Sequence, residues 1–332
     1  MNAINKNFFT KYKSIIFGIE ILRMILCFWV ITFHYSGKKI KFKYKIITHF
    51  YYVPTFFFIS FYLTYKIFTL KSIIKIKQRF ERLIIPYITI PIIFLIIKFF
   101  SSDFKKNIKN ILLDLYVQYI TGYYFYIHLW FVQNLIIYTM LCGIIFFFFK
   151  KNNLFILQML SIILFWLKCN GIVKKIFNNL KSYFTSFKNI IIMMPIAISG
   201  IILGSMEILK ILLKSRIKCM IFCVIIFYFI YNFNFFGEIS LILVSLSLFT
   251  FFSLIPLEKI KNKPIINIIK IITKYTGGIY YFQQNIKYLL NKSSFFRIRP
   301  FLSCCFIYIF GYFICMIGTK IFKNNKLKYI FN

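Results

Sequence analysis

The sequence predicts an all-α fold, a polytopic bundle of about ten transmembrane helices with both termini in the cytoplasm. The 332-residue chain is 60% hydrophobic and only 15% charged, and its mean hydropathy is +0.77. Soluble domains are about 45–50% apolar and about 25% charged. Apolar runs also recur along the whole chain, and many of them reach the roughly 20 residues that a membrane-spanning helix needs.

The net charge of +36 comes from lysines and arginines that gather in short clusters between the apolar runs, for example at 38–45, 71–82, 214–218 and 259–263. Such clusters are typical of loops that lie against anionic lipid headgroups. We therefore do not expect a nucleic-acid partner, although a soluble protein of this charge would suggest one. The eight cysteines lie in or beside apolar runs and form no complete metal-ligand pattern, so we interpret them as small core residues and predict no metal site.

The spans can be placed in order along the chain. The first apolar run follows a basic N-terminus, exceeds the apolar region of a signal peptide and lacks a cleavage pattern, so it is interpreted as a retained span. Two segments, 101–123 and 170–187, are expected to be exposed. The ten predicted spans are 15–36, 47–69, 83–100, 125–149, 153–169, 188–206, 217–236, 238–256, 276–291 and 300–322.

The segments that share a side with the N-terminus carry more Lys and Arg than the opposite loops. This difference favours a cytoplasmic N-terminus, and ten spans then place the C-terminus on the same side. The sequence contains no glycine-rich phosphate loop, no soluble catalytic domain and no evident repeat. We therefore expect residues 1–332 to form a single integral-membrane domain without a soluble C-terminal domain.

The first span carries three ionisable side chains, Glu20, Arg23 and His34. Such groups are costly in a membrane, so each is a candidate functional residue. Arg23 and His34 are eleven positions apart, which places them on one helix face about 16 Å apart. Glu20 can pair with Arg23, and this pair has either a structural or a functional role. His34 is either an interfacial hydrogen-bonding residue or, as a neutral imidazole in a polar cavity, a general base.

Several stretches resemble acyltransferase family 3, whose members are integral-membrane enzymes that acylate extracytoplasmic sugars and lipids. The first helix has Arg, ten residues and then His, as in the family. Phe61 stands where many members have Gly, and the soluble esterase-like domain of some members is not expected here. Further matches are "VPTFFFISFYLTYK" (53–66), "KIKQRFERLIIPY" (75–87), "IHLWFVQNLIIY" (127–138) and "GGIYYFQQNIKYLL" (277–290).

The resemblance implies that His34, Arg23 and Glu20 form the catalytic group and that Arg79 and Arg82 bind acyl-CoA. Guanidinium groups bind phosphate oxygens well, and acyl-CoA is a cytoplasmic molecule with several phosphates. Ordinary anchoring of a positive inner loop is the alternative interpretation of the arginine pair.

Seven further residues are weaker candidates for the cavity or the acceptor site. His128 has three alternative interpretations: it lines a sugar site, it positions the acyl group, or it belongs to an interfacial aromatic belt. The serine and the tyrosine are hydrogen-bond donors that also suit a structural role, and the three amides need polar partners if they are buried. These seven candidates are Ser60, Tyr87, His128, Trp130, Gln283, Gln284 and Asn285.

The predicted activity is O-acetyl transfer in the cytoplasmic (inner) membrane. An acyl group, acetyl by family analogy, would move from cytoplasmic acyl-CoA to a hydroxyl of an extracytoplasmic or lipid-linked glycan of the cell envelope. Acetyl-CoA is then the donor substrate, the glycan and membrane lipid are partners, and no metal takes part. The alternative is a transporter or flippase of a lipid-linked sugar, but such proteins more often have paired halves, and the sequence shows no internal symmetry.

Overall fold

The described parts of the chain are helical in this computed structural model. The structure describes residues 2–35, 52–69, 73–100, 108–121, 129–149, 152–170, 185–205, 212, 215–233, 239–255, 263–291, 293, 295–296 and 299–331. Within these ranges there are twelve α-helices, one 3-10 helix and no strand, which confirms the all-α prediction. The elements are α1 (Asn2–Tyr35), α4 (Tyr52–Thr69), α5 (Ile73–Phe100), α6 (Ile108–Thr121), α7 (Leu129–Phe148), α8 (Asn153–Cys169), α10 (Thr185–Ser205), α12 (Arg216–Phe233), α13 (Ile239–Leu254), α14 (Lys263–Lys274), α15 (Thr276–Leu290), α17 (Pro300–Ile321) and η4 (Lys326–Ile330).

Each of the ten predicted spans falls on one of these helices, and α8 has the bounds predicted for it. Three features differ from the expectation. Helix α5 begins at Ile73 rather than at residue 83, helix α6 lies inside the segment 101–123, and helix α14 was not predicted. All three stretches are helical sequences with charged residues among their apolar residues, so a search for unbroken apolar runs does not detect them.

Within the described residues, four helices are long and apolar enough to cross a membrane, and their apolar windows are Phe17–His34, Ile74–Ile97, Leu129–Phe148 and Phe301–Ile321. Shorter apolar helices cover Asn153–Leu167, Met193–Ser205 and Ser240–Leu254. Outward-facing apolar side chains such as Ile88, Ile92 and Ile96 of α5 are exposed, as expected for a surface in contact with lipid. These findings identify a membrane protein, while the ten spans and the cytoplasmic termini stay predictions.

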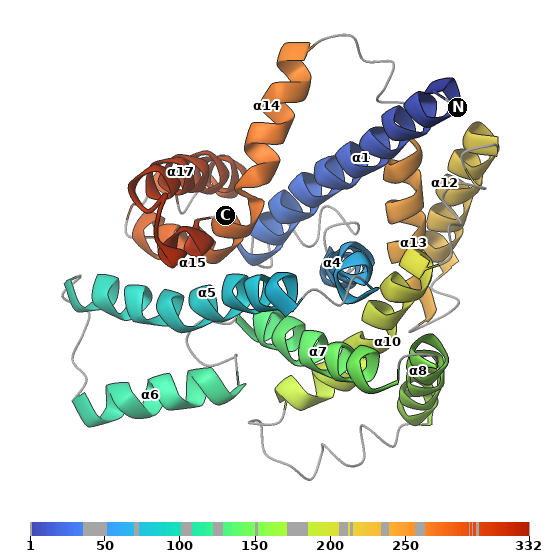
Figure 1. Ribbon diagram of the computed structural model, residues 1–332. Helices are drawn as coiled ribbons and strands as arrows, with labels where there is room; N and C mark the ends of the chain where they lie inside the picture. Colours follow the sequence, from blue (N-terminus) through green and yellow to red (C-terminus); the bar gives the residue numbers. More distant parts are fainter. Residues whose placement is uncertain are drawn as a thin grey trace.

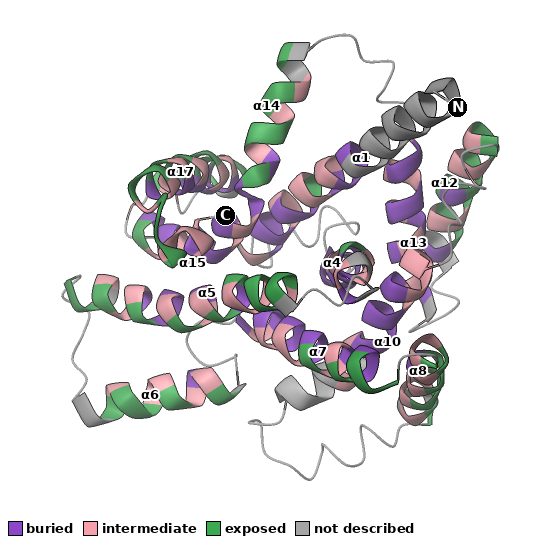
Figure 2. Ribbon diagram, viewed as in Figure 1, coloured by how far each residue is buried: buried purple, intermediate pink, exposed green. Residues whose placement is uncertain are grey.

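Helix α4 lies at the centre of the described bundle, between α1 on one side and α7 and α10 on the other (Figure 1). Its residues are mostly buried, whereas α5, α8 and α12 each have an exposed face (Figure 2). The α4–α10 contact is close because a Cβ on Gly200 would collide with the carbonyl oxygen of Phe58. Helix α4 is therefore held firmly in place, and it forms one wall of the site described below.

Three contacts show how α1 runs against its neighbours. Cys27 Sγ lies 3.5 Å from the carbonyl oxygen of Thr276, and Lys287 Nζ donates to the carbonyl oxygen of His34 at 2.7 Å. Helices α1 and α15 thus lie side by side and run in the same direction. The Phe33 ring packs on the Tyr52 ring at 5.5 Å, so the end of α1 meets the beginning of α4.

Candidate active site

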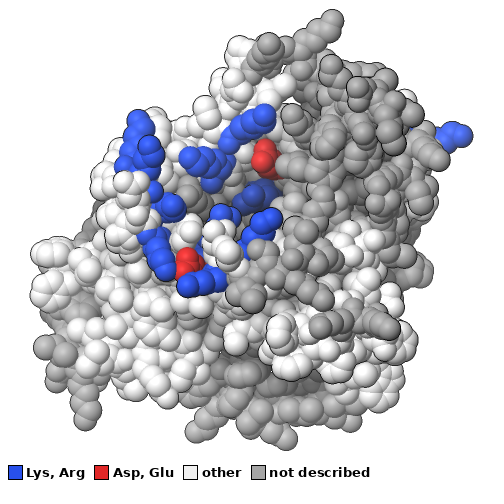
Figure 3. Space-filling model, viewed as in Figure 1, with Lys and Arg blue, Asp and Glu red and all other residues white. Residues whose placement is uncertain are grey.

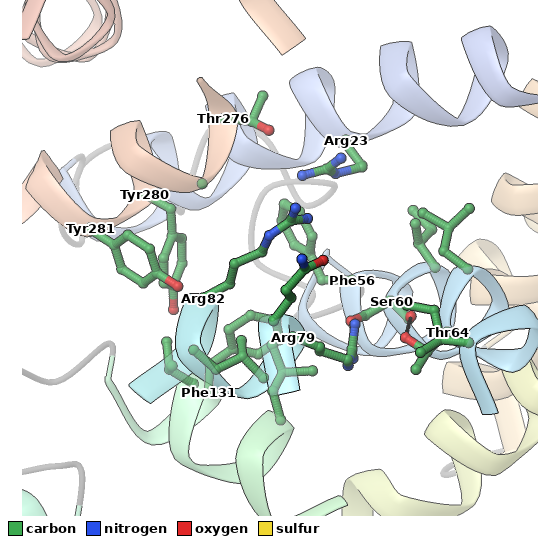
Figure 4. A pocket seen from close by; sticks show the side chains of 18 of the residues that line it. Arg23, Phe56, Ser60, Thr64, Arg79, Arg82, Phe131, Thr276, Tyr280 and Tyr281 are labelled. Atoms are coloured by element: carbon green, nitrogen blue, oxygen red, sulfur yellow. Dashed lines mark hydrogen bonds between the residues drawn. The ribbon is translucent and has the colours of Figure 1, made fainter. Parts of the chain in front are cut away.

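Helices α1, α4, α5, α7 and α15 surround a cavity of about 510 Å³. Four cationic side chains line it, Arg23 from α1 and Lys75, Arg79 and Arg82 from the beginning of α5. The described residues that line the cavity include no Asp or Glu. Arg23, Arg79 and Arg82 reach into the same space (Figure 4), and Lys and Arg side chains surround a hollow on this face of the molecule (Figure 3). Like charges held this close repel one another, so the cavity favours an anionic ligand.

Arg79 is fixed in place by two neighbouring helices. Its Nη2 donates to Oγ of Ser60 at 3.0 Å, and its Nε donates to Oγ1 of Thr139 at 3.1 Å. The guanidinium carbon also lies 5.4 Å from the centre of the Phe61 ring. Phe61 thus contributes a cation–π contact. Arg79 is pre-oriented before any ligand arrives.

Arg82 is the more exposed of the two α5 arginines. Its guanidinium carbon lies 5.7 Å from the centre of the Tyr329 ring, which comes from the far end of the chain. The next residues that line the cavity are the first two of α15, Thr276 and Gly277. A helix N-terminus carries unpaired backbone N–H groups and partial positive charge, so this end of α15 adds to the preference for an anion.

The cavity is elongated along α4. Its α4 lining extends from Ile67 to Phe56, eleven positions and therefore about 16 Å of helix. One turn beyond Phe56 lies Tyr52, whose ring packs on Phe33, the neighbour of His34. Arg79 bonds to Ser60 within this stretch, so the arginines lie partway along the cavity. The Phe56 end of the cavity is the end nearer to His34 on α1.

The three predicted catalytic residues do not share one place in the structure. Arg23 lines the cavity, and Glu20 and His34 are half-buried residues of α1 outside the described lining. Glu20 and Arg23 lie one turn apart on α1 and interact electrostatically, although their pair is not among the close salt bridges of the described residues. The His34 ring contacts Phe33 edge-on at 5.2 Å. Between Arg23 and His34, α1 is covered by α15, where Cys27 meets Thr276.

The weaker candidates are also separated. Ser60 lines the cavity and holds Arg79. Tyr87 lies outside the described lining and donates to the carbonyl oxygen of Tyr119 at 2.5 Å, which ties α6 to α5. Trp130 stands next to the lining residue Phe131, and its ring contacts that residue edge-on. His128 lies outside the described residues.

The three amides of α15 lie away from the described lining of the cavity. Gln283 and Asn285 are buried, each with 3% of its surface exposed, and Gln284 is half-buried. Neither amide group of Gln283 and Asn285 has a hydrogen-bond partner among the described residues. Their predicted role in the acceptor site stays a prediction.

Several residues that line the cavity or contact its arginines were missed by sequence reasoning. Thr139 has no distinguishing signal, because it is one polar residue in an apolar helix. Tyr280 and Tyr281 fall in a stretch that already resembled the family, and their position beside the glycines could have singled them out. Tyr329 could not have been found, because its contact with Arg82 spans most of the chain.

The fold and the cavity define a helical membrane protein with a strongly cationic ligand site. A family model described as an acyltransferase domain matches residues 16–320, nearly the whole chain, and the chain therefore belongs to acyltransferase family 3. This match confirms the resemblance carried by the sequence motifs. Searches of the curated proteins and of the solved structures found no match. The chain is thus a membrane acyltransferase.

Proposed function

We propose that this acyltransferase takes its acyl group, most simply acetyl, from cytoplasmic acyl-CoA. The observation that carries the proposal is the cavity lined by Arg23, Lys75, Arg79 and Arg82 without a carboxylate among its described lining residues. Guanidinium forks suit the phosphate oxygens of the donor. The N-terminal turn of α15 supports the same end of the ligand.

The elongated shape of the cavity fits the shape of this donor. Acyl-CoA carries its phosphates at one end and its thioester at the end of a long flexible arm. In the proposal the phosphates lie at Arg79 and Arg82, near Ser60, and the arm follows α4 from there past Phe56. The thioester then approaches the His34 end of α1, about 16 Å from Arg23 along the helix.

The acceptor in this proposal is a hydroxyl of an extracytoplasmic or lipid-linked glycan of the cell envelope. His34 accepts the proton as the hydroxyl oxygen attacks the thioester carbonyl. The C–S bond breaks, CoA leaves as its thiol, and the new ester stays on the glycan. Arg23, which lines the cavity with Arg79 and Arg82, holds the anionic part of the donor. The protein would act from the cytoplasmic (inner) membrane.

The proposal is tested with the purified protein in detergent. We expect it to bind CoA and to consume acetyl-CoA when a glycan acceptor is supplied. The His34→Ala variant should keep CoA binding and lose transfer by about 100-fold or more, whereas Arg23→Lys should weaken both. Transfer at the wild-type rate in His34→Ala would contradict the proposed role of His34.

A second experiment separates the proposal from the transporter alternative and identifies the acceptor. Cells with and without the protein are compared by mass spectrometry of their surface glycans. An acetyl group that depends on the protein supports transfer. Altered glycan export together with unchanged acetylation and no CoA turnover by the purified protein would favour a transporter.

A further inference from the structure

The chain ends in a compact turn that folds back onto the bundle. We call residues 322–331, which follow α17 and contain η4, the C-terminal turn. The Asn325 side chain accepts from the backbone N–H of Leu327 at 3.1 Å, and the N–H of Phe331 donates to the carbonyl oxygen of Lys328 at 3.1 Å. The turn contacts α5, α15 and α17. It is thus a folded part of the domain.

An aromatic anchor fixes the C-terminal turn against two helices. The Phe331 ring stacks on Phe322 with ring centres 5.6 Å apart and on Phe282 of α15 with ring centres 5.4 Å apart. Two glycines leave room for it. A Cβ on Gly278 would lie 2.6 Å from the carbonyl oxygen of Phe331, and a Cβ on Gly318 would collide with the Phe331 ring. This fit determines where the preceding residues of the turn lie.

From this anchor the turn reaches two successive residues of α5. Lys326 Nζ pairs with Glu81 Oε1 at 2.7 Å, and the Tyr329 ring lies against the Arg82 guanidinium. The hydrogen bond to Glu81 raises the pKa of Lys326, so this lysine stays charged throughout the neutral range. The Lys326 side chain is 65% exposed, and an exposed pair contributes little by itself. The Tyr329 contact therefore carries the argument for Arg82.

We propose that the C-terminal turn positions Arg82 for the anionic ligand of the cavity, with Tyr329 as the positioning residue. Arg79 is oriented by hydrogen bonds from its guanidinium to α4 and α7. The described residues offer Arg82 no such pair of hydrogen bonds. The contact with the Tyr329 ring orients the Arg82 guanidinium instead. The Lys326–Glu81 pair ties the turn to the same helical turn of α5. Only the identity of the ligand as acyl-CoA rests on the proposed function.

The first measurement is the affinity of the purified full-length protein for CoA. Loss of a cation–π contact of this kind should weaken binding in Tyr329→Ala by about fivefold. Tyr329→Phe keeps an aromatic ring and should bind nearly as well as the wild type. Lys323→Ala, an exposed lysine of the same turn, is the control and should leave binding unchanged. Equal affinity of Tyr329→Ala and the wild type would overturn the proposal.

The second measurement needs no ligand. Hydrogen–deuterium exchange of the peptide that covers 73–82 should be faster in Tyr329→Ala than in the wild type, and unchanged in Lys323→Ala. If the wild type does not bind CoA, the proposed donor is wrong, and the exchange result then decides on the C-terminal turn alone. Unchanged exchange in Tyr329→Ala would overturn the positioning role, whatever the ligand proves to be.

Discussion

Nη2 of Arg79 lies 3.0 Å from Oγ of Ser60, and this hydrogen bond joins α5 to α4 at the cavity. Both residues were selected from the sequence for different reasons, Arg79 as a phosphate ligand and Ser60 as a hydrogen-bond donor in the cavity. In the structure the serine hydroxyl accepts from the guanidinium, which leaves the predicted donor role of its own O–H untested. Ser60 thus acts by orienting Arg79.

Removing either acceptor should loosen Arg79. We expect Ser60→Ala and Thr139→Val each to weaken CoA binding, because a half-buried guanidinium loses one of two hydrogen bonds that fix it. The loss of a partner to a charged group costs about 1–3 kcal/mol. Titration of purified variants with CoA measures the effect. Ser199→Ala is the control, since the Ser199 hydroxyl donates to the Pro195 carbonyl oxygen within α10 and lies outside the described lining of the cavity. A loss of affinity in this variant as large as in Ser60→Ala would contradict the assignment.

The affinity for CoA should fall as the salt concentration rises. A cavity arginine should contribute to this salt dependence, and a neighbouring lysine outside the cavity should not. Arg82 lines the cavity, whereas Lys77 lies on the opposite face of α5 and is exposed. We expect Arg82→Gln to lower the affinity about tenfold and to make it less sensitive to salt, because one ion pair with phosphate is lost. Lys77→Gln should change neither quantity. The CoA affinities of the variants and the wild type are measured from low to high NaCl. Identical salt responses of Arg82→Gln and the wild type would exclude a direct role of Arg82.

Sequence reasoning predicted the helices that are unbroken apolar runs and missed those that are not. Residues 153–169 were predicted as a span and form α8. The beginning of α5 and the whole of α14 mix lysines with apolar residues, and such amphipathic helices do not reach the apolar length of a span. The missed part of α5 matters most, because it carries the row of cations in the cavity.

For the site, the sequence identified residue types but could not place them relative to one another. Arg23, Arg79 and Arg82 were predicted to be functional, and they line one cavity. His34 shares a helix face with Arg23, yet it lies beyond the described lining, because α15 packs along that face. Tyr329 was missed, since contacts between distant positions leave no periodic pattern in one sequence.

Two glycines in the bundle should respond in opposite directions to a methyl group. A Cβ on Gly200 would collide with the Phe58 carbonyl oxygen, whereas the nearest atom to a Cβ on Gly143 is on the Phe68 ring at 3.8 Å. We expect Gly200→Ala to destabilise the protein by about 1–3 kcal/mol through overpacking. Gly143→Ala should be neutral or stabilise it by up to about 1 kcal/mol, because alanine favours a helix interior. Thermal unfolding in detergent compares the two, and equal midpoints would contradict the close α4–α10 contact.

The buried amides of α15 provide a test of whether the acceptor site extends beyond the described cavity. Gln283 and Asn285 are buried, and their side-chain polar atoms have no partner among the described residues. Burying an amide without a partner is costly. If no substrate uses it, Asn285→Leu, an apolar residue of similar size, should leave transfer unchanged and raise the unfolding midpoint. If the predicted acceptor role is right, the same variant should instead lose transfer while CoA binding stays intact.

We expect Asn285→Leu to lose transfer, because a buried amide that is costly to the fold is best explained by a polar ligand. Acetyl transfer, CoA affinity and thermal unfolding measured together on Asn285→Leu and Gln283→Leu give the answer. A stabilised variant with full activity would remove that residue from the acceptor site.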